Sequence, residues 1–356
     1  MKLFHYMEKY NTEYKDYTNS VAVMISTDRL LFMEKSQVRA RMLEYMKLYK
    51  ELHIIVFSSK KMDPIVISSG CKIYSTNSRL RINYVSDACK LAKNIVKDIS
   101  KDIPILVTCQ DPFETALVGK YMANLRKDSE LLIQIHTDLL SPYFIDKRIG
   151  IVNSCLNRVR LFISKFTLPH AQVIRVVSRK IADSFVSSGI SREKIVVKPI
   201  DINIGYINNP TPPFSLKSKF PKFSKIIILV ARLEPEKNVS MAIDAMKIVN
   251  GVRSDIGLII VGSGSEAQKL KKQAYNLNLS QTVVFEGWQT DLTPYYRGAD
   301  LLLVTSWYEG YGMVFKEAQS VGLKIVSADV GIAREMGVNI VEWNPNSFAK
   351  GILNTI

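Results

Sequence analysis

Residues 306–322 contain two glutamates whose spacing around a pair of glycines could bind both a phosphate and a sugar. Residues 301–304 are apolar and too few for a helix, which predicts a buried strand. Gly310 and Gly312 then interrupt the chain, and the amphipathic residues 313–320 predict a helix. Glu309 is therefore expected in a glycine turn before a helix N-terminus, and Glu317 on the second turn of that helix.

A strand, a glycine turn and a helix direct several backbone N–H groups towards one point, which the helix dipole makes attractive to an anion. A carboxylate beside a sugar accepts hydrogen bonds from neighbouring hydroxyls, as the acid of dinucleotide-binding folds does for a ribose. One turn could thus hold a phosphate and a sugar together. The alternative is an ordinary turn with one solvated glutamate and one glutamate near a helix N-terminus, since either is common alone.

Two cations are expected at the same edge of the predicted sheet. Residues 226–231 predict a strand and residues 239–250 a helix, and Arg232 and Lys237 lie between them. Two cations there could neutralise a diphosphate leaving group in place of a metal ion. Considered alone, two solvated basic residues around a turn are the simpler interpretation; beside the Glu309 turn, a binding role is favoured.

Residues 262–267 carry a competing signal, because Gly262, Gly264 and Ala267 match the dinucleotide-binding fingerprint and Glu286 ends the next predicted strand. The pattern is short, and a hydride-transfer enzyme would leave the four charged residues above without a role. The sequence has no phosphate loop of the G-x-x-x-x-G-K-[ST] type and no Asp-x-Asp pair near a predicted strand end. Metal-assisted chemistry therefore has no support in the sequence.

Length and composition indicate a globular protein of two domains. The chain has 356 residues, of which 47% are hydrophobic and 23% charged, and no apolar run approaches 18 residues. The first twenty residues lack the apolar core of a signal peptide, so a cytoplasmic location is expected. The four cysteines show no paired or metal-ligand spacing, which gives no indication of disulfides or zinc.

Strand and helix patterns alternate in both halves, which predicts two α/β, Rossmann-like domains facing a central cleft. In the first half the strands are expected at 21–26, 53–57, 103–108, 131–135, 173–177 and 195–197, and the helices at 37–51, 87–99, 112–125, 156–163 and 179–186. Residues 208–225 are rich in proline and serine and predict a linker. The expected organisation is an N-terminal extension (1–20), an acceptor-side domain (21–207), the linker (208–225) and a donor-binding domain (226–356).

Polar residues follow several predicted strands of the first domain, where ligands bind to open parallel sheets. Thr27 and Asp28 follow the first strand, and these later positions follow others: Gln110, Asp111, His136, Asp138 and Ser178. A lone histidine is more often structural than catalytic. His136 is favoured only because other polar residues end strands in the same way.

Six ordered motifs resemble the signature of glycosyltransferase family 4. They are Ala231-Arg-Leu-Glu-Pro-Glu-Lys-Asn, Val261-Gly-Ser-Gly, Phe285-Glu-Gly, Ala299-Asp-Leu, Ser306-Trp-Tyr-Glu-Gly-Tyr-Gly-Met-Val-Phe-Lys-Glu-Ala and Gly331-Ile-Ala-Arg-Glu. The match spans residues 226–335, and residues 110–113, 135–138 and 174–178 agree more loosely. The resemblance implies the GT-B architecture and a retaining, sugar-nucleotide-dependent enzyme.

The resemblance also implies roles for the matching residues. Arg232 and Lys237 would hold the donor diphosphate, Glu309 would meet the donor sugar, and His136 would face that sugar across the cleft as a fourth catalytic residue. Glu317 would bind the ribose. The backbone around sugar and phosphate would come from Gly310, Tyr311, Gly312, Met313 and Val314. Asp111, Asp138 and Ser178 are expected on the acceptor side, and the resemblance implies no metal and no cofactor.

The expected function is therefore metal-independent transfer of a sugar from a nucleotide sugar to a glycan, glycolipid or lipid-linked acceptor, as in polysaccharide biosynthesis. Two alternatives stay open: a catalytically inactive nucleotide-sugar-binding partner subunit, and a sugar-nucleotide epimerase of the same architecture. The segment 26–37 lacks the glycines that the family usually has after the first strand, and Lys324 replaces a usual proline. These departures leave the acceptor undefined.

The basic surplus suggests where an acceptor comes from. Lys and Arg exceed Asp and Glu by 12 in residues 1–212 and by 3 in residues 213–356. In the predicted helix around 156–166, three cations accompany Leu161, Phe162 and Phe166, which suits an anionic membrane surface. The alternative is a surface helix whose apolar residues face the first domain's sheet. A peripheral position at the inner face of the membrane is expected, and no nucleic-acid partner.

Overall fold

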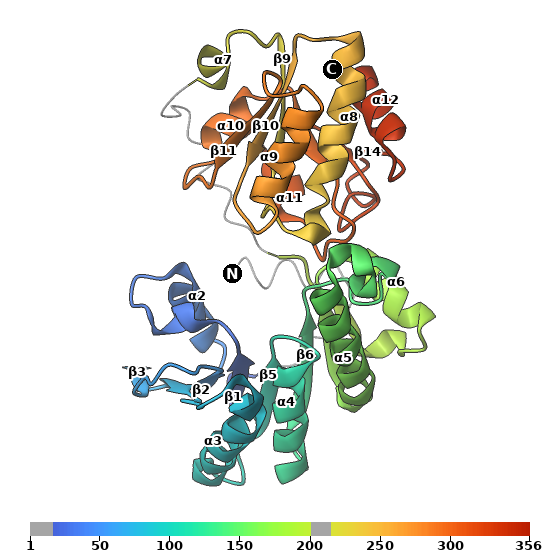
Figure 1. The fold of residues 1–356 in the computed structure, drawn as a ribbon. Coiled ribbons are helices and arrows are strands. Elements are labelled where there is room, and N and C mark those ends of the chain that lie inside the picture. The colour runs from blue at the N-terminus through green and yellow to red at the C-terminus, as the bar shows by residue number, and fades with distance from the viewer. Residues whose placement is uncertain (1–16, 201–214) are drawn as a thin grey trace. The chain divides into compact units, whose positions relative to one another are not determined.

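The computed structural model describes residues 17–200 and 215–356, and its contacts divide the chain into two compact units, each seen in Figure 1. The first unit takes its described residues from 17–136, 156–177 and 182–198, and the second from 137–155, 178–181, 199–200 and 215–356. The predicted N-terminal extension lies outside the described residues except for 17–20, and the predicted linker is described only from residue 215. The predicted domain limits stay predictions.

The first unit is built on an eight-stranded sheet in the order β3-β4-β2-β1-β5-β6-β7-β8. All neighbours pair in parallel except β3 and β4, which are antiparallel. The strands are β1 (Val21–Ser26), β2 (Glu51–Val56), β3 (Ile65–Ser68), β4 (Cys71–Ser75), β5 (Ile105–Cys109), β6 (Glu130–Ile135), β7 (Val173–Val176) and β8 (Ile195–Val197). Nearly continuous apolar runs such as β2 suit strands covered on both faces.

Helices cover both faces of this sheet. They are α2 (Gln37–Met46), α3 (Tyr84–Asp98), α4 (Glu114–Leu125), α5 (Ile151–Thr167) and α6 (Arg179–Ser187), the last two beginning in residues that belong to the second unit. On one face, Met42 of α2 and Leu31 pack with Ala22, Ile54 and other strand residues in one apolar cluster. α3 packs on β2, and α4 packs on β1, β5 and β6.

The second unit is built on a six-stranded parallel sheet in the order β11-β10-β9-β12-β13-β14. The strands are β9 (Lys225–Val230), β10 (Ile256–Val261), β11 (Val283–Gly287), β12 (Leu301–Val304), β13 (Lys324–Ser327) and β14 (Asn339–Ile340). The helices are α7 (Leu216–Lys219), α8 (Val239–Val252), α9 (Ala267–Asn276), α10 (Thr293–Gly298), α11 (Met313–Ser320) and α12 (Pro345–Thr355). α8 packs against α9 and α12, and α11 packs against β13.

Several predicted boundaries differ from the structure. The helix predicted at 37–51 ends at Met46, because residue 51 already pairs with Val21 as the first residue of β2. α5 begins at Ile151 rather than at 156. One helical turn, α7, forms inside the predicted linker, where the Ser215 Oγ accepts a hydrogen bond from the Ser218 N–H at 3.4 Å. β3, β4, β13, β14 and α12 were not predicted from the sequence.

No helix in the described parts of the chain combines the length and the apolar character needed to cross a membrane.

Candidate active site

Four turns of the second unit meet at one edge of its sheet, because β9, β10, β12 and β13 run parallel and end on the same side. From β9 the chain continues to β10 and β11 in one direction, whereas β12, β13 and β14 lie on the other side of β9. The carboxyl ends of β9 and β12 therefore form the point where the strand order reverses, which is where open α/β sheets bind ligands.

Lys237 and Glu309 come together at this point. The Lys237 Nζ lies 2.6 Å from the Glu309 Oε1, and the Ser306 Oγ donates to the same oxygen at 2.8 Å. Both charged side chains are mostly buried, with 16% and 14% exposed. The backbone joins the two turns as well, because the Trp307 N–H donates to the Glu236 carbonyl at 2.9 Å. The sequence predicted both charged residues and missed Ser306.

Arg232, the second predicted cation, lies at the same turn in a different setting. Its side chain is 72% exposed, and its Nη2 lies 3.0 Å from the Glu236 Oε1. The structure thus brings Lys237 and Glu309 together and leaves Arg232 paired with Glu236 at the surface. Glu236 was not predicted, although its spacing of four residues from Arg232 is typical of ion pairs on helical turns.

The glycine turn has the geometry expected from the sequence. Gly312 has a φ of +79°, and a Cβ there would come within 2.5 Å of the Phe315 ring, so both backbone conformation and space require glycine. α11 follows directly, and its first N–H groups have no partners within the helix. Met313 at that end is 46% exposed, whereas Tyr311 is 5% exposed. The helix N-terminus therefore reaches the surface next to Glu309.

Gly331 brings a second loop onto the glycine turn. A Cβ at this residue would lie 2.4 Å from the Tyr311 carbonyl oxygen, and its φ is +51°. The next residue, Ile332, donates its N–H to that carbonyl at 3.1 Å. The loop after β13 thus fixes the backbone of the turn after β12.

Glu317 is buried behind the helix N-terminus. Its side chain is 5% exposed, and the Tyr296 hydroxyl donates to its Oε2 at 2.5 Å. A sequence pattern could not have indicated Tyr296, which comes from α10. Ribose binding by Glu317 stays a prediction.

The residues of the competing dinucleotide signal have structural explanations. A Cβ at Gly262 would lie 1.8 Å from the Ala231 carbonyl oxygen, and one at Gly264 would lie 2.4 Å from the Leu233 carbonyl oxygen. These glycines are required because the turns after β9 and β10 touch. Glu286 accepts a hydrogen bond from the Tyr295 hydroxyl at 2.6 Å and is paired with Lys219.

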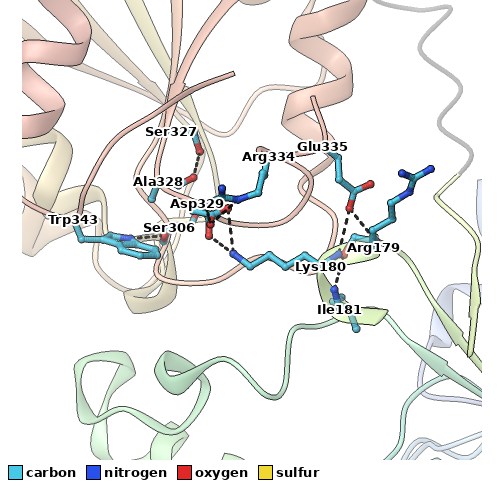
Figure 2. A network of polar contacts seen from close by, with 11 residues as sticks. Arg179, Lys180, Ile181, Ser306, Ser327, Ala328, Asp329, Arg334, Glu335 and Trp343 are labelled. Carbon is cyan, nitrogen blue, oxygen red and sulfur yellow. Dashed lines mark hydrogen bonds and ion pairs between the residues drawn. The ribbon is translucent and has the colours of Figure 1, made fainter. Parts of the chain in front are cut away.

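Lys180 joins the loop after β13 to the start of α6, within the second unit (Figure 2). Its Nζ donates to the Asp329 carbonyl and lies 3.4 Å from the Asp329 Oδ1. The Glu335 Oε1 accepts from the backbone N–H groups of Arg179 at 2.7 Å and of Lys180 at 3.4 Å. Burial raises the pKa of Asp329, but the bond from Arg334 and the charge of Lys180 outweigh it and hold that pKa below its usual range.

An aromatic cluster supports the turn that carries Glu309. The rings of Tyr143 and Trp307 stack with centroids 5.1 Å apart, and the Trp343 centroid lies 5.1 Å from Tyr143. Trp343 also donates its Nε1–H to the Ser306 carbonyl at 3.0 Å, as Figure 2 shows. The Arg148 guanidinium lies 4.9 Å from the Trp307 ring centroid. No role was predicted from the sequence for any of these side chains.

His136 lies in the first unit, directly after β6. Its Nε2 lies 3.3 Å from the Gln134 Oε1. Desolvation, and after it the positive charges of Arg175 and Arg41, lower the pKa of His136 to about 4. The imidazole is therefore neutral near pH 7. Because the Gln134 oxygen can only accept, the hydrogen bond places the proton on Nε2 and leaves Nδ1 as an acceptor.

Two of the three predicted acceptor-side residues accept hydrogen bonds from backbone N–H groups two or three residues later, and the third is buried. Asp111 accepts the Phe113 N–H at 2.8 Å, and burial raises its pKa. Ser178 is fully buried and accepts the Ile181 N–H at 3.3 Å in the first turn of α6. Asp138 is 5% exposed, burial raises its pKa, and its Oδ1 has no hydrogen-bond partner among the described residues. Asp138 and Ser178 belong to the second unit, and an acceptor role for all three stays a prediction.

Other polar residues at the end of β1 form hydrogen bonds with neighbouring residues. The Gln110 Oε1 accepts from the Ser26 Oγ and from the Thr27 N–H, both at 2.9 Å. Asp28 accepts the Leu30 N–H at 2.9 Å. Within residues 17–200 and 215–356, no group of three or more His, Cys, Asp or Glu side chains could hold a metal ion.

Comparisons with known proteins identify the second half of the chain. Residues 213–352 match the family model for glycosyl transferases group 1. Over 137 residues the chain is 34% identical to an uncharacterized glycosyltransferase of Methanocaldococcus jannaschii, covering 36% of this chain and 35% of that protein. Over 169 residues it is 29% identical to the lipopolysaccharide 1,6-galactosyltransferase of Salmonella typhimurium, covering 45% of each. The chain spans less than half the length of these curated relatives.

Solved structures share the fold of nearly the whole chain. Anabaena HepE in complex with UDP and glucose matches with a TM-score of 0.66 and 18% identity, covering 94% of this chain and 89% of HepE. At this identity the likeness shows the fold alone. The fold class predicted from the sequence is therefore confirmed: the protein has the GT-B fold, and its residues 213–352 match the family model for glycosyl transferases group 1.

Proposed function

We propose that this protein is a retaining glycosyltransferase of family 4 that moves a hexose from a nucleotide sugar to an acceptor without a metal ion. The observation that carries the proposal is the Lys237–Glu309 pair, held at 2.6 Å where the strand order of a group 1 domain reverses. The named glycosyltransferases among the relatives and the UDP and glucose bound by HepE support a nucleotide-sugar donor.

The reaction breaks the bond between the sugar C1 and a phosphate oxygen and forms a bond from C1 to the acceptor oxygen on the same face. The acceptor proton passes to the leaving phosphate oxygen. Negative charge develops on the departing diphosphate, and a cation already fixed in place stabilises it without reorganisation. Lys237 meets this requirement because Glu309 holds its ammonium in a mostly buried position. The N-terminus of α11 adds oriented N–H groups, and exposed Arg232 adds a second charge.

The other predicted residues have proposed roles as well. Glu309 would accept hydrogen bonds from hydroxyls of the donor sugar, and Glu317 from the ribose. The neutral His136 would accept a hydrogen bond from a sugar hydroxyl at Nδ1, for which the Gln134 contact provides the correct tautomer. In this proposal residues 226–356 hold the donor, and residues 21–207 provide the acceptor side.

Product analysis distinguishes this function from the two alternatives. Incubation with a panel of nucleotide sugars should release free nucleotide, and an acceptor should receive the sugar with the anomeric configuration of the donor. An epimerase would instead convert the donor without any acceptor, and an inactive partner subunit would bind the donor without nucleotide release. Inversion of the configuration, read by NMR of the product, would contradict the retaining mechanism.

The acceptor or its carrier is proposed to lie at an anionic membrane surface, on the cytoplasmic side, and α5 supports this. The sequence left open whether the apolar residues of this helix face the sheet. For two phenylalanines that alternative is wrong, because Phe162 is 75% and Phe166 55% exposed. The buried side of α5 is instead polar: Ser154, Asn157, Ser164 and Thr167. Thr167, for example, donates its Oγ1–H to the Pro112 carbonyl at 2.6 Å.

The exposed side of α5 combines apolar and positive groups. Val159 is 56% exposed and lies on the same helix face as Phe162 and Phe166, at spacings of three and four residues. Arg158 and Lys165 are exposed beside them, and the Lys120 Nζ lies 3.3 Å from the Phe166 ring centroid. Apolar side chains that enter the headgroup region and cations that meet anionic lipids suit reversible attachment to a membrane.

A further inference from the structure

A row of polar side chains crosses one face of the first unit's sheet. Thr108 pairs with Leu132, two residues before Gln134, and Gln134 pairs with Arg175, so these side chains share a face. Met24 pairs with Thr108 and lies on the same face of the sheet. Met24 also packs against the apolar cluster that contains α2 residues. Hydrogen bonds run along the row: Gln134 donates its Nε2–H to the Thr108 Oγ1 at 3.0 Å, and Arg175 donates to the Gln134 Oε1 at 3.3 Å. The polar row therefore fixes the position of the guanidinium.

Arg175 has no carboxylate partner among residues 17–200 and 215–356. It is partly buried, and its Nε has no hydrogen-bond partner among those residues. Desolvation lowers its pKa, and the side chains that oppose this effect are the phenols of Tyr45 and Tyr49 rather than carboxylates. Buried cations in proteins are normally paired with an anion, because a lone charge is costly to remove from water.

A second cation adds positive charge near the histidine. After desolvation and the charge of Arg175, the charge of the exposed Arg41 of α2 also lowers the pKa of His136. The Gln134 Oε1 accepts from Arg175 at 3.3 Å and lies 3.3 Å from the His136 Nε2, so it connects the cation to the histidine. The Arg175 guanidinium and a neutral imidazole thus flank the Gln134 oxygen, the charge of Arg41 acts on the same imidazole, and among the described residues no carboxylate is paired with Arg175 or shifts the pKa of His136. Such a spot attracts an oxyanion, and a guanidinium fork suits a phosphate.

We infer that Arg41, Thr108, Gln134, His136 and Arg175, which we call the Arg175 cluster, bind a phosphate group of the acceptor. The assignment of this phosphate group to the acceptor rests on the proposed function, because the Arg175 cluster contains His136, which is proposed to contact the transferred sugar. The anion site itself depends only on the geometry and charge of the first unit.

The first test uses inorganic phosphate and the full chain. With the ionic strength held constant by chloride, phosphate at pH 7 should raise the melting temperature and shift the His136 C2–H NMR signal to a plateau. The chain has only four histidines, so the spectrum of a His136→Gln variant assigns that signal. Arg175→Gln should weaken phosphate binding by about tenfold or more, because a charge-assisted hydrogen bond is lost. Arg79→Gln, at an exposed arginine of the same unit, should bind phosphate like the wild type.

Equal phosphate responses in the wild type and Arg175→Gln would overturn the inference, as would no response in the wild type. If Arg175→Gln fails to fold, Arg175→Lys keeps the charge without the fork and should give a weakened but measurable response. UDP binding, measured by calorimetry, separates this inference from the proposed function. Wild-type protein that binds phosphate but not UDP would refute the donor assignment alone, whereas UDP affinity that falls with Arg175→Gln would place the anion site on the donor instead.

A second pair of probes identifies the source of the phosphate. Glycerol 3-phosphate represents a soluble acceptor, and vesicles that contain phosphatidic acid represent a lipid acceptor. Both present the same phosphate chemistry, so the inference predicts that Arg175→Gln weakens whichever of the two binds. Binding of either probe that Arg175→Gln leaves unchanged would contradict the assignment.

Discussion

Lys237 and Glu309 are 72 residues apart in sequence, yet they form an ion pair of 2.6 Å where the strand order of the second sheet reverses. Three neighbouring bonds hold the pair in place. The Ser306 hydroxyl donates to the same carboxylate oxygen, the Thr305 Oγ1 donates to the Lys237 carbonyl, and the Trp307 N–H donates to the Glu236 carbonyl. A fixed cation beside a helix N-terminus is what a departing diphosphate requires.

Replacement of Lys237 by Ala should lower the turnover number more than the donor affinity, because the charge that it stabilises appears only in the transition state. The expected loss is about a hundredfold or more. Steady-state kinetics with calorimetric donor binding provide the measurement. Arg297→Ala, at an exposed cation of α10 on the same unit, serves as the control. A large loss of affinity at unchanged turnover would mean that Lys237 acts in ground-state binding only.

Arg232→Ala should act in the same direction as Lys237→Ala but more weakly, because the Arg232 side chain is 72% exposed and water screens its charge. The comparison is made on the ratio of turnover numbers at saturating donor. A loss that exceeds that of Lys237→Ala would show that Arg232 leaves Glu236 and becomes the main diphosphate contact.

Glu317→Ala should weaken donor binding by about 1.5 to 3 kcal/mol if this glutamate holds the ribose. Tyr296→Phe is the matched control, because it removes the hydroxyl that donates to Glu317 and leaves the carboxylate in place. Calorimetry with the nucleotide and circular dichroism of both variants provide the measurement. Wild-type affinity in a folded Glu317→Ala variant would remove the ribose role.

The lowered pKa of His136, about 4, predicts how this residue makes the free energy of unfolding depend on pH. The unfolded chain binds a proton at this residue near the ordinary pKa of 6.5, whereas the folded chain binds it only near 4. The unfolded state therefore binds more protons as the pH falls through this window, so this contribution lowers stability between about pH 6.5 and 4 and is constant above it. Denaturant titrations of the wild type and His136→Gln test this: the variant should lose less stability in that window, and equal slopes would contradict it.

Trp343→Phe should reduce the turnover number and lower the stability by about 1 kcal/mol, because the hydrogen bond to the Ser306 carbonyl is lost while the ring is largely kept. Trp288→Phe, at an exposed tryptophan, is the control. Stability comes from denaturant unfolding. If the variant turns over like the wild type, the aromatic cluster does not position the Glu309 turn.

Phe162→Ser should weaken attachment to anionic vesicles by about tenfold, because an aromatic side chain leaves the interface. Tyr275→Ser removes an aromatic residue of similar exposure, 72%, from α9 and should have no effect. Co-sedimentation with anionic and neutral vesicles at low and high salt is the measurement. Negligible pelleting of the wild type with both would count against a membrane-bound acceptor and favour a soluble one.

Much of the second unit could be predicted from sequence, because short apolar runs followed by glycine turns have little freedom. β12 and α11 begin and end at the predicted residues. The Glu309 turn was predicted from local spacing alone. β3 and β13 were missed because such short strands depend on their sheet partners.

The partners of the predicted residues could not be read from sequence, because they come from distant segments. Tyr296 reaches Glu317 from another helix, and Trp343 reaches Ser306 across 37 residues. The exposure of the apolar face of α5 could not be predicted from the sequence for another reason. An apolar stripe predicts which residues share a helix face, but only the tertiary structure shows that this face points to solvent.

Nucleotide release by the full chain is the most direct measure of the proposed transfer and of the role of Lys237. The protein is incubated with a panel of nucleotide sugars in the presence of a metal chelator, and free nucleotide is measured for the wild type and for Lys237→Ala. We expect release from at least one donor, undiminished by the chelator, and about a hundredfold slower release in the variant. Donor binding without release from any member of the panel, with or without acceptor, would contradict it.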